Sequence, residues 1–154
     1  MSLDVQERLR DAGLRATMSR VAVLRVLEAS HDHPRVDQVI DRVRASGVSI
    51  SIQAAYDVCD ALRGASLARR IQPADSPARY EARVGDNHHH VVCRACGATA
   101  DVDCATGRTP CLAAAQTHGF VIDEAEVTYW GVCPACRAPA DETKEPAWPM
   151  TAGP

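Results

Sequence analysis

Two Cys-x-x-Cys pairs that begin 40 residues apart constrain this 154-residue chain more than any other feature. One pair is Cys93 and Cys96, and the other is Cys133 and Cys136. Together they supply four soft thiolate ligands, the set that a tetrahedral structural zinc ion prefers. Because the pairs stand near the two ends of the second half of the chain, a zinc ion bound between them would join the start of this region to its end.

A redox couple is the alternative interpretation of these cysteines. The stretch "WGVCPAC" is similar to the active site of thioredoxins, but that site begins a helix in a parallel α/β fold, which this sequence does not predict. A region of about 45 ordered residues also has too small a core to be stable alone, so a bound metal would have a structural role. We therefore favour zinc binding over redox chemistry.

Length and charge are consistent with two small units that share one chain. Residues 1–83 carry 13 basic and 11 acidic side chains, whereas residues 84–154 carry 4 and 9, so the only basic excess lies in the first half. This excess weakly favours an anionic partner there. No stretch has the roughly 20 apolar residues of a membrane span or the apolar run of a signal peptide. We expect a cytoplasmic protein with no membrane partner and with reduced cysteines.

The first 65 residues predict short helices, because apolar side chains recur there at helical spacing between capping and terminating residues. We expect Ser19 to cap the second helix, and Ser49 or Ser51 to cap the fourth. The four predicted helices are 3–13, 19–30, 35–47 and 49–65.

After Gly64 the apolar period changes to two, so the stretch "LARRIQPADSPARYEARV" predicts two strands around a turn. Helices followed at once by a basic hairpin have the order of a winged-helix DNA-binding domain. A helical bundle with a surface hairpin is the alternative that the same pattern allows.

The second half predicts a small mixed region after a hinge at residues 84–87. From Arg137 onward the chain is rich in proline, alanine and charge, which is typical of a disordered tail. The predicted strands are 89–93, 98–104 and 125–133, with a helix over 109–119.

Three consecutive histidines, residues 88–90, stand directly before the first cysteine pair. On a strand, His88 and His90 point to one face and His89 points to the other, so two imidazoles can share one metal. The alternative interpretation is an exposed loop or a chance histidine run.

Other ligands for that metal are available from nearby segments. Glu81 leaves the hairpin just before the hinge, Asp101 lies on the following strand, and His33 lies between two predicted helices, where a surface or capping role is the alternative. A metal bound by ligands from both halves would fix the angle between them. A nitrogen and oxygen set without thiolate suits Fe(II), Mn(II) or Zn(II). The candidate set is His33, Glu81, His88 and His90, with Asp101 beside it.

Five stretches together resemble the ferric uptake regulator (Fur) superfamily over roughly residues 6–137: "GLRATMSRVAVLRVL", "HDHP", "AAYDVCDAL", "ARYEARVGDNHHHVVCRACG" and "WGVCPAC". The stretch "RRIQPADSPARYEARVGDNHHHVVCRACGATADVDC" is similar to its actinobacterial catalase-peroxidase-linked branch. The resemblance implies an α+β fold with a winged-helix DNA-binding domain over residues 1–84. A small α/β dimerisation domain with a structural zinc would follow over residues 85–137, and then a tail over 138–154.

The resemblance also implies roles for individual residues. The structural zinc ligands would be Cys93, Cys96, Cys133 and Cys136. The regulatory ligands would be His33, Glu81, His88 and His90, with Asp101 aligned to a carboxylate that some peroxide-sensing members use.

For DNA contacts, Tyr56 matches the tyrosine of the recognition helix and Arg15 matches a basic residue that approaches the minor groove. Ile52 and Asp57 stand where related sequences carry arginine, which places more weight on the hairpin arginines. Those arginines are Arg69, Arg70 and Arg79. At a further metal site of some members, Asn87, Arg108 and Ala125 stand where ligands would be expected. The remaining candidates there are His89 and, as alternatives, His118, Glu124 or Glu126.

The implied function is that of a metal-dependent, DNA-binding transcriptional repressor and not of an enzyme. As a homodimer with structural Zn(II) and regulatory Fe(II) or Mn(II), it would bind an inverted-repeat operator in double-stranded DNA and respond to iron or peroxide. Its own operon and a catalase-peroxidase gene would be its targets. A zinc-uptake regulator of the same superfamily is the alternative, although no regulatory position here is cysteine. A thiol redox protein is a more distant alternative.

Overall fold

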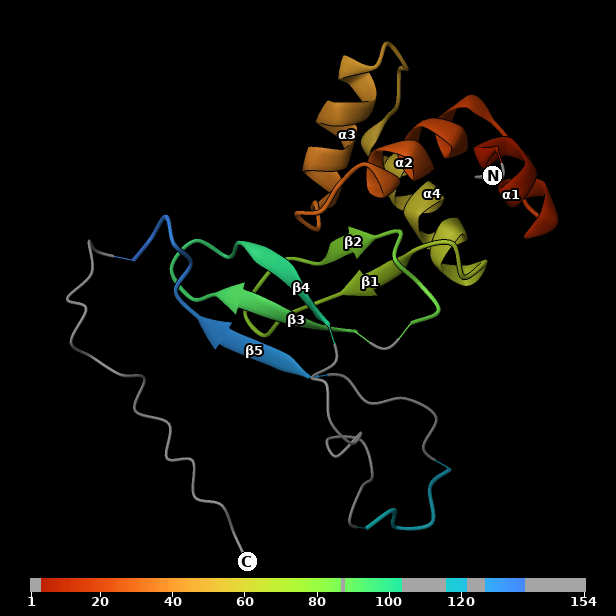
Figure 1. Cartoon of the computed structure of the whole chain (residues 1–154). Helices are drawn as coiled ribbons and strands as arrows, with labels where there is room; N and C mark the ends of the chain where they lie inside the picture. The colour runs from red at the N-terminus through yellow and green to blue at the C-terminus, as the bar shows by residue number, and fades with distance from the viewer. Residues whose placement is uncertain (1–3, 87, 104–115, 122–126, 138–154) are drawn as a thin grey trace, which may run out of the picture.

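The computed structural model describes residues 4–86, 88–103, 116–121 and 127–137. Four helices form one lobe, and two small sheets lie beside it, with the hairpin between the helices and the larger sheet (Figure 1). We call the helices and the hairpin the helical unit, and the larger sheet with its cysteine turns the sheet unit. The elements are α1 (Val5–Asp11), α2 (Met18–Glu28), α3 (Val36–Ala45), α4 (Ile52–Gly64), β1 (Arg69–Ile71), β2 (Arg79–Glu81), β3 (His88–Cys93), β4 (Thr99–Asp103) and β5 (Thr128–Gly131).

The helical unit is built around α2, which packs against α1, α3 and α4. Its core is aliphatic, as the helical spacing predicts, and Leu24, Leu27 and Leu62 are almost completely buried in it. Helix α4 begins after Ser51, whose side chain accepts a hydrogen bond from the N–H of Ala54, as predicted. Helix α2 is also present as predicted, but its predicted cap is wrong, because Thr17 caps the helix in place of Ser19.

The predicted hairpin is confirmed, because β1 pairs antiparallel with β2 and Arg70 lies opposite Tyr80. Tyr80 is only 3% exposed and packs into the helical core. Its N–H donates to the carbonyl of Pro34 at 3.0 Å, which attaches the hairpin to the loop after α2.

The sheet unit has the strand order β4-β3-β5, in which β3 is antiparallel to β4 and parallel to β5. These strands confirm the three predicted ones: β3 begins one residue before its predicted start, and β4 and β5 lie within the predicted ranges. The predicted helix over 109–119 lies largely outside the described residues, and its last four residues are not helical. The predicted tail over 138–154 also lies outside them. No helix within the described part of the chain is long and apolar enough to cross a bilayer.

Replacement of Leu24 by alanine should strongly destabilise the helical unit. Leu24 is fully buried where α2 meets the other helices, so Leu24→Ala removes apolar contacts and leaves a cavity at a cost of about 2–5 kcal/mol. Urea unfolding of the zinc-loaded protein, followed by circular dichroism, measures this loss. Met18→Ala on the same helix is the control, since Met18 is 74% exposed. Equal losses in both variants would contradict this description of the core.

Candidate metal centres

The two cysteine pairs meet at one end of the sheet unit. Strand β3 ends at Cys93, and the second pair follows β5. One sulfur of each cysteine lies within 4.8 Å of the other three, and the Sγ atoms of Cys96 and Cys133 are 3.7 Å apart. Sulfurs bound at about 2.3 Å to one tetrahedral zinc lie about 3.8 Å from each other. The four cysteines therefore fit a zinc ion.

Backbone groups also favour the thiolate form at this end of the sheet. The N–H of Cys133 donates to the Sγ of Cys93 at 3.3 Å, and together with the N–H of Cys96 it lowers the pKa of Cys93 to about 6. Hydrogen bonds with the thiols of Cys96 and Cys133 instead raise the pKa of Cys136 to about 12. Because four thiolates repel one another, their complete deprotonation requires a compensating cation.

A second cluster of ligands lies at the junction of the helical and sheet units. The Nε2 of His33 is 3.0 Å from an oxygen of Glu81 and 2.7 Å from an oxygen of Asp101. The Nε2 of His90 is 3.4 Å from the other oxygen of Glu81. Nitrogen and oxygen ligands about 2.1 Å from one metal lie roughly 3.0 to 3.4 Å apart. These four side chains each place a ligand atom within 4.8 Å of the others, so they also fit a metal.

His88 borders this cluster. Its Nε2 lies 3.1 Å from an oxygen of Glu81 and 3.8 Å from an oxygen of Asp101. The predicted alternation is present: the rings of His88 and His90 lie side by side with centroids 4.9 Å apart, whereas His89 lies beside Tyr129. His89 therefore takes no part in the cluster.

Charge in the cluster is balanced between carboxylates and imidazoles. Burial alone would raise the pKa of Glu81, but hydrogen bonds with His33 and His90 outweigh burial and lower its pKa below the ordinary value. Burial lowers the pKa of His33, whereas Glu81 and Asp101 raise it, and the net result is a raised pKa. The site therefore stabilises a carboxylate next to a positive charge, which is the role that a bound cation fills.

Two residues that the sequence did not single out orient these ligands. The Nδ1 of His88 lies 2.8 Å from an oxygen of Asp86, and this hydrogen bond, followed by one from Arg83, lowers the pKa of Asp86. The guanidinium of Arg83 also reaches Asp101 at 3.2 Å and Asp103 at 2.7 Å. Such outer contacts set the direction of a ligand. The only signal in the sequence is an aspartate two positions before the first histidine.

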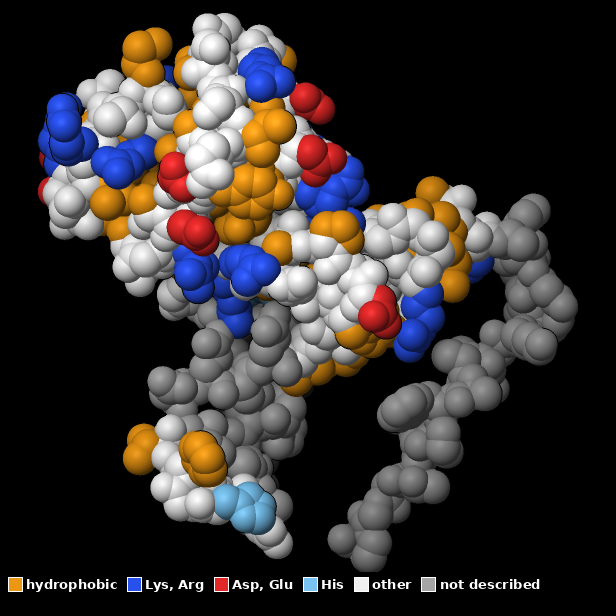
Figure 2. Space-filling model, turned by 180° about the vertical axis from the view of Figure 1, so that it is seen from behind, with side chains coloured by type: hydrophobic (Ala, Val, Ile, Leu, Met, Phe, Trp, Pro, Cys, Tyr) orange, Lys and Arg blue, Asp and Glu red, His pale blue; other side chains and the backbone are white. Residues whose placement is uncertain are grey.

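The predicted DNA-contacting residues do not all lie on the surface. Arg15 and Arg70 are exposed, Arg69 is partly exposed, and Tyr56 on α4 is 49% exposed. On the face seen in Figure 2, basic side chains are scattered over the helical unit among acidic ones. Arg79 differs from the expectation: it is buried, and its guanidinium donates to the backbone carbonyls of His33 and Gly97. Arg79 is therefore not available to DNA.

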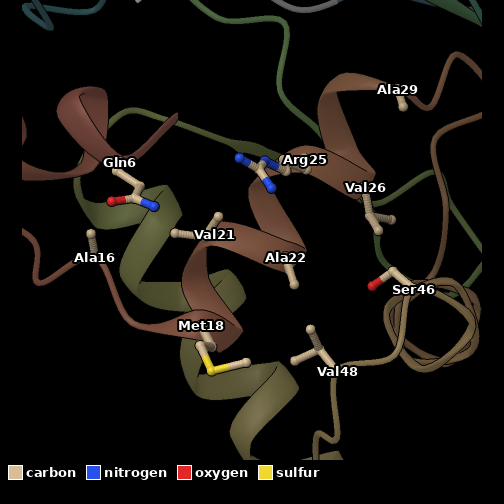
Figure 3. Close-up of a pocket in the computed structure, with 10 residues that line it drawn as sticks. All are labelled: Gln6, Ala16, Met18, Val21, Ala22, Arg25, Val26, Ala29, Ser46 and Val48. Carbon is tan, nitrogen blue, oxygen red and sulfur yellow. The ribbon is translucent and has the colours of Figure 1, made fainter. Parts of the chain in front are cut away.

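An apolar groove of about 470 Å³ lies on the outer side of α2. In Figure 3, Met18 and Ala22 from α2 face Val48 from the segment before α4 across this groove. No candidate metal ligand lines it. The groove is therefore not part of either cluster.

Comparison with known proteins gives a consistent result. A sequence model of the Ferric uptake regulator family matches residues 11–130. Transcriptional regulator FurA of Mycobacterium tuberculosis is 56% identical over 133 residues, which are 86% of this chain and 90% of that protein. Peroxide-responsive repressor PerR of Staphylococcus aureus is 27% identical over 129 residues, which are 84% of this chain and 86% of that protein.

Among solved structures, a zinc-bound manganese uptake regulator is similar, with 26% identity and a TM-score of 0.65, over 85% of this chain and 99% of that one. The family match covers well over half of the chain, and the curated relatives match along most of their length. This chain belongs to the ferric uptake regulator family and is a metal-responsive transcriptional regulator, not an enzyme.

Proposed function

We propose that this chain represses transcription as a homodimer whose affinity for double-stranded operator DNA is set by a metal at the histidine–carboxylate cluster. The observation that carries the proposal is the origin of the ligands. His33 and Glu81 belong to the helical unit, whereas His90 and Asp101 belong to the sheet unit. Because the ligands come from both units, metal binding favours the arrangement that brings the units together.

The regulatory ion in this proposal is Fe(II) or Mn(II), held by His33, Glu81, His90 and Asp101, with His88 at the edge of the set. The donor chemistry supports it, since the cluster offers imidazole and carboxylate but no thiolate. This set also disfavours a zinc-uptake regulator, which we would expect to use a cysteine. When bound, the metal supplies positive charge and directed bonds, while the chain supplies orientation through Asp86 and Arg83.

A structural zinc held by Cys93, Cys96, Cys133 and Cys136 completes the proposal. It would fix the end of β3 to the residues after β5. Support comes from the sulfur spacing and from a solved relative that is described as zinc-bound.

Dimerisation would use the sheet unit. Strand β5 is an edge strand, and among the described residues its outer edge has no partner strand. Tyr129 within β5 and Val132 directly after it are exposed apolar side chains. An edge of this kind is a template for pairing with a second chain.

DNA binding would use the exposed part of the helical unit. We propose that Tyr56 on α4 approaches the bases, while Arg15, Arg69 and Arg70 contact the backbone. A 56% identical relative that is named a transcriptional regulator, and a more distant one named a peroxide-responsive repressor, support this use. We propose its own operon and a catalase-peroxidase gene as targets, with peroxide acting through oxidation of a histidine ligand or of the zinc thiolates.

His90→Ala should remove the metal response of DNA binding. Without His90, Asp101 is the one proposed ligand that the sheet unit still supplies, so the metal no longer holds the two units together firmly. The Mn(II)-induced gain in affinity, typically about 5- to 150-fold for such coupling, should therefore disappear. Fluorescence anisotropy with an inverted-repeat operator, with and without Mn(II), measures the gain. His31→Ala, an exposed histidine in the same loop as His33, is the control. A full response in His90→Ala would refute the proposed switch.

Cys96→Ser should release zinc and dissociate the dimer. Three thiolates form an incomplete tetrahedral set, and the sheet unit depends on the zinc for its stability. Metal analysis and analytical ultracentrifugation give the zinc content and the mass. In Cys59→Ala, which changes a buried cysteine of the helical core, both should stay unchanged. A zinc-loaded dimer of Cys96→Ser would show that the four cysteines do not form the proposed site.

Arg70→Ala should weaken binding to all DNA sequences and reduce its salt dependence. Loss of one phosphate contact lowers the slope of log K against log salt by about 0.9. Binding titrations at several salt concentrations measure that slope. Arg94→Ala, an exposed arginine of the sheet unit, should leave it unchanged. An unaltered slope in Arg70→Ala would mean that Arg70 does not touch the DNA backbone.

A further inference from the structure

Arg79 is a buried cation that contacts both units. Its side chain is only 7% exposed, and no ion pair with a carboxylate joins it within the described parts of the chain. Its Nη1 donates to the carbonyl of His33 at 3.0 Å, and its Nη2 donates to the carbonyl of Gly97 at 2.5 Å. A buried charge with so few partners is costly, so its position calls for a physical reason.

The first of these contacts constrains a metal ligand. His33 has a φ of 50°, in the left-handed region that non-glycine residues rarely adopt. Its ring Nδ1 is buried without a hydrogen-bond partner among the described residues, so no acceptor there sets the direction of the ring. His88, in contrast, is oriented through its Nδ1 by Asp86. Apart from the contacts of its Nε2 with Glu81 and Asp101, the position of the His33 ring depends on its backbone. Arg79 holds the carbonyl of His33, and the N–H of Tyr80 holds the carbonyl of the next residue, Pro34.

The second contact reaches the first cysteine turn, residues 93–97. The N–H of Gly97 donates to the carbonyl of Cys93 at 2.9 Å, so the zinc-binding turn fixes the direction of the Gly97 carbonyl. The two groups are tightly packed, since a Cβ added at Gly97 would lie 3.2 Å from the Nη2 of Arg79. A change in this turn would therefore displace the guanidinium.

We propose that Arg79 is a positioning residue that couples the two metal centres: the zinc-binding turn holds Arg79, and Arg79 holds His33 in its ligating position. The proposal rests on the function proposed above. It implies that loss of zinc or oxidation of its thiolates weakens metal binding at the histidine–carboxylate cluster. Because linkage is reciprocal, Mn(II) bound at that cluster should also slow the loss of zinc.

Arg79→Lys tests the contact with His33. Lysine keeps the charge but lacks the two-pronged guanidinium, so the Kd for Mn(II), measured by isothermal titration calorimetry on the zinc-loaded full-length protein, should rise about 10- to 100-fold. The absorption spectrum of Co(II) bound at the cluster should change as well. Arg94→Ala, an arginine within the cysteine turn that stacks on Trp130, is the matched control and should behave as wild type. An unchanged Kd and spectrum in Arg79→Lys would overturn the proposal.

Gly97→Ala disturbs the contact between the cysteine turn and Arg79 without replacing a ligand of either centre. Alone it should raise the Kd for Mn(II) several-fold, but combined with Arg79→Lys it should add nothing, because the shared contact is already lost. Additive effects on the Kd would overturn the coupling. If Arg79→Lys fails to fold, Gly97→Ala alone still tests the proposal, because an unchanged Kd for Mn(II) in that variant would overturn it.

Zinc release to a chelator supplies the reciprocal measurement. Mn(II) should slow zinc release in wild type and in Arg94→Ala, but not in Arg79→Lys. Equal slowing in all three proteins would contradict the proposal that Arg79 couples the two centres. The proposed function is judged separately, by the Mn(II) response of operator binding in wild type. If that response is absent while Mn(II) still binds, the switch fails, and the Kd series still decides the role of Arg79. If wild type binds neither Mn(II) nor Fe(II) at the cluster, both proposals are wrong.

Discussion

The buried carboxylate of Glu81 is the group on which the geometry between the two units depends. It is 3% exposed, and its oxygens lie close to the imidazoles of His33, His88 and His90. A buried carboxylate is costly unless positive charge compensates it. A metal ion, or a proton on one of the rings, must therefore be present between the units when they pack in this way. The arrangement of the units is thus inherently sensitive to cations.

The candidate ligands of the two units are oriented by different kinds of contact. On the sheet side, Arg83 joins Asp86 and Asp101, which in turn contact His88 and His33. The ion pairs of Arg83 are exposed and contribute little stability, so their effect is on the direction of the ligands more than on the free energy of folding. On the helical side no such side-chain contact acts on the outer nitrogen of His33, and the constraint is a buried one on its backbone. The helical ligand therefore depends on the fold itself, whereas His88 depends on a local network.

Much of the fold and of the candidate sites can be predicted from the sequence, because they follow from the spacing of apolar residues or from the chemistry of the ligands. Helical spacing gave the four helices, and strand alternation separated His88 and His90 from His89. What failed depended on packing between distant segments. Alternation in the hairpin indicates on which face Arg79 lies, but not that the sheet unit covers this face. The sequence therefore predicts a DNA contact for an arginine that is buried. The cap of α2 was missed because two hydroxyl residues stand close together and only one has the required backbone angles.

The two candidate metal centres are connected by more than one path. Strand β3 is six residues long and carries His88 and His90 at its start and Cys93 at its end. It therefore links the two centres through the backbone. Arg79 adds a non-covalent link from the cysteine turn to His33, which is the candidate ligand most distant in sequence from the sheet unit. On this geometry, oxidation of a histidine ligand and oxidation of the zinc thiolates would have the same consequence, since each removes one support of the cluster. If peroxide acts by either of the two proposed routes, the expected structural event is therefore the same, a separation of the helical unit from the sheet unit.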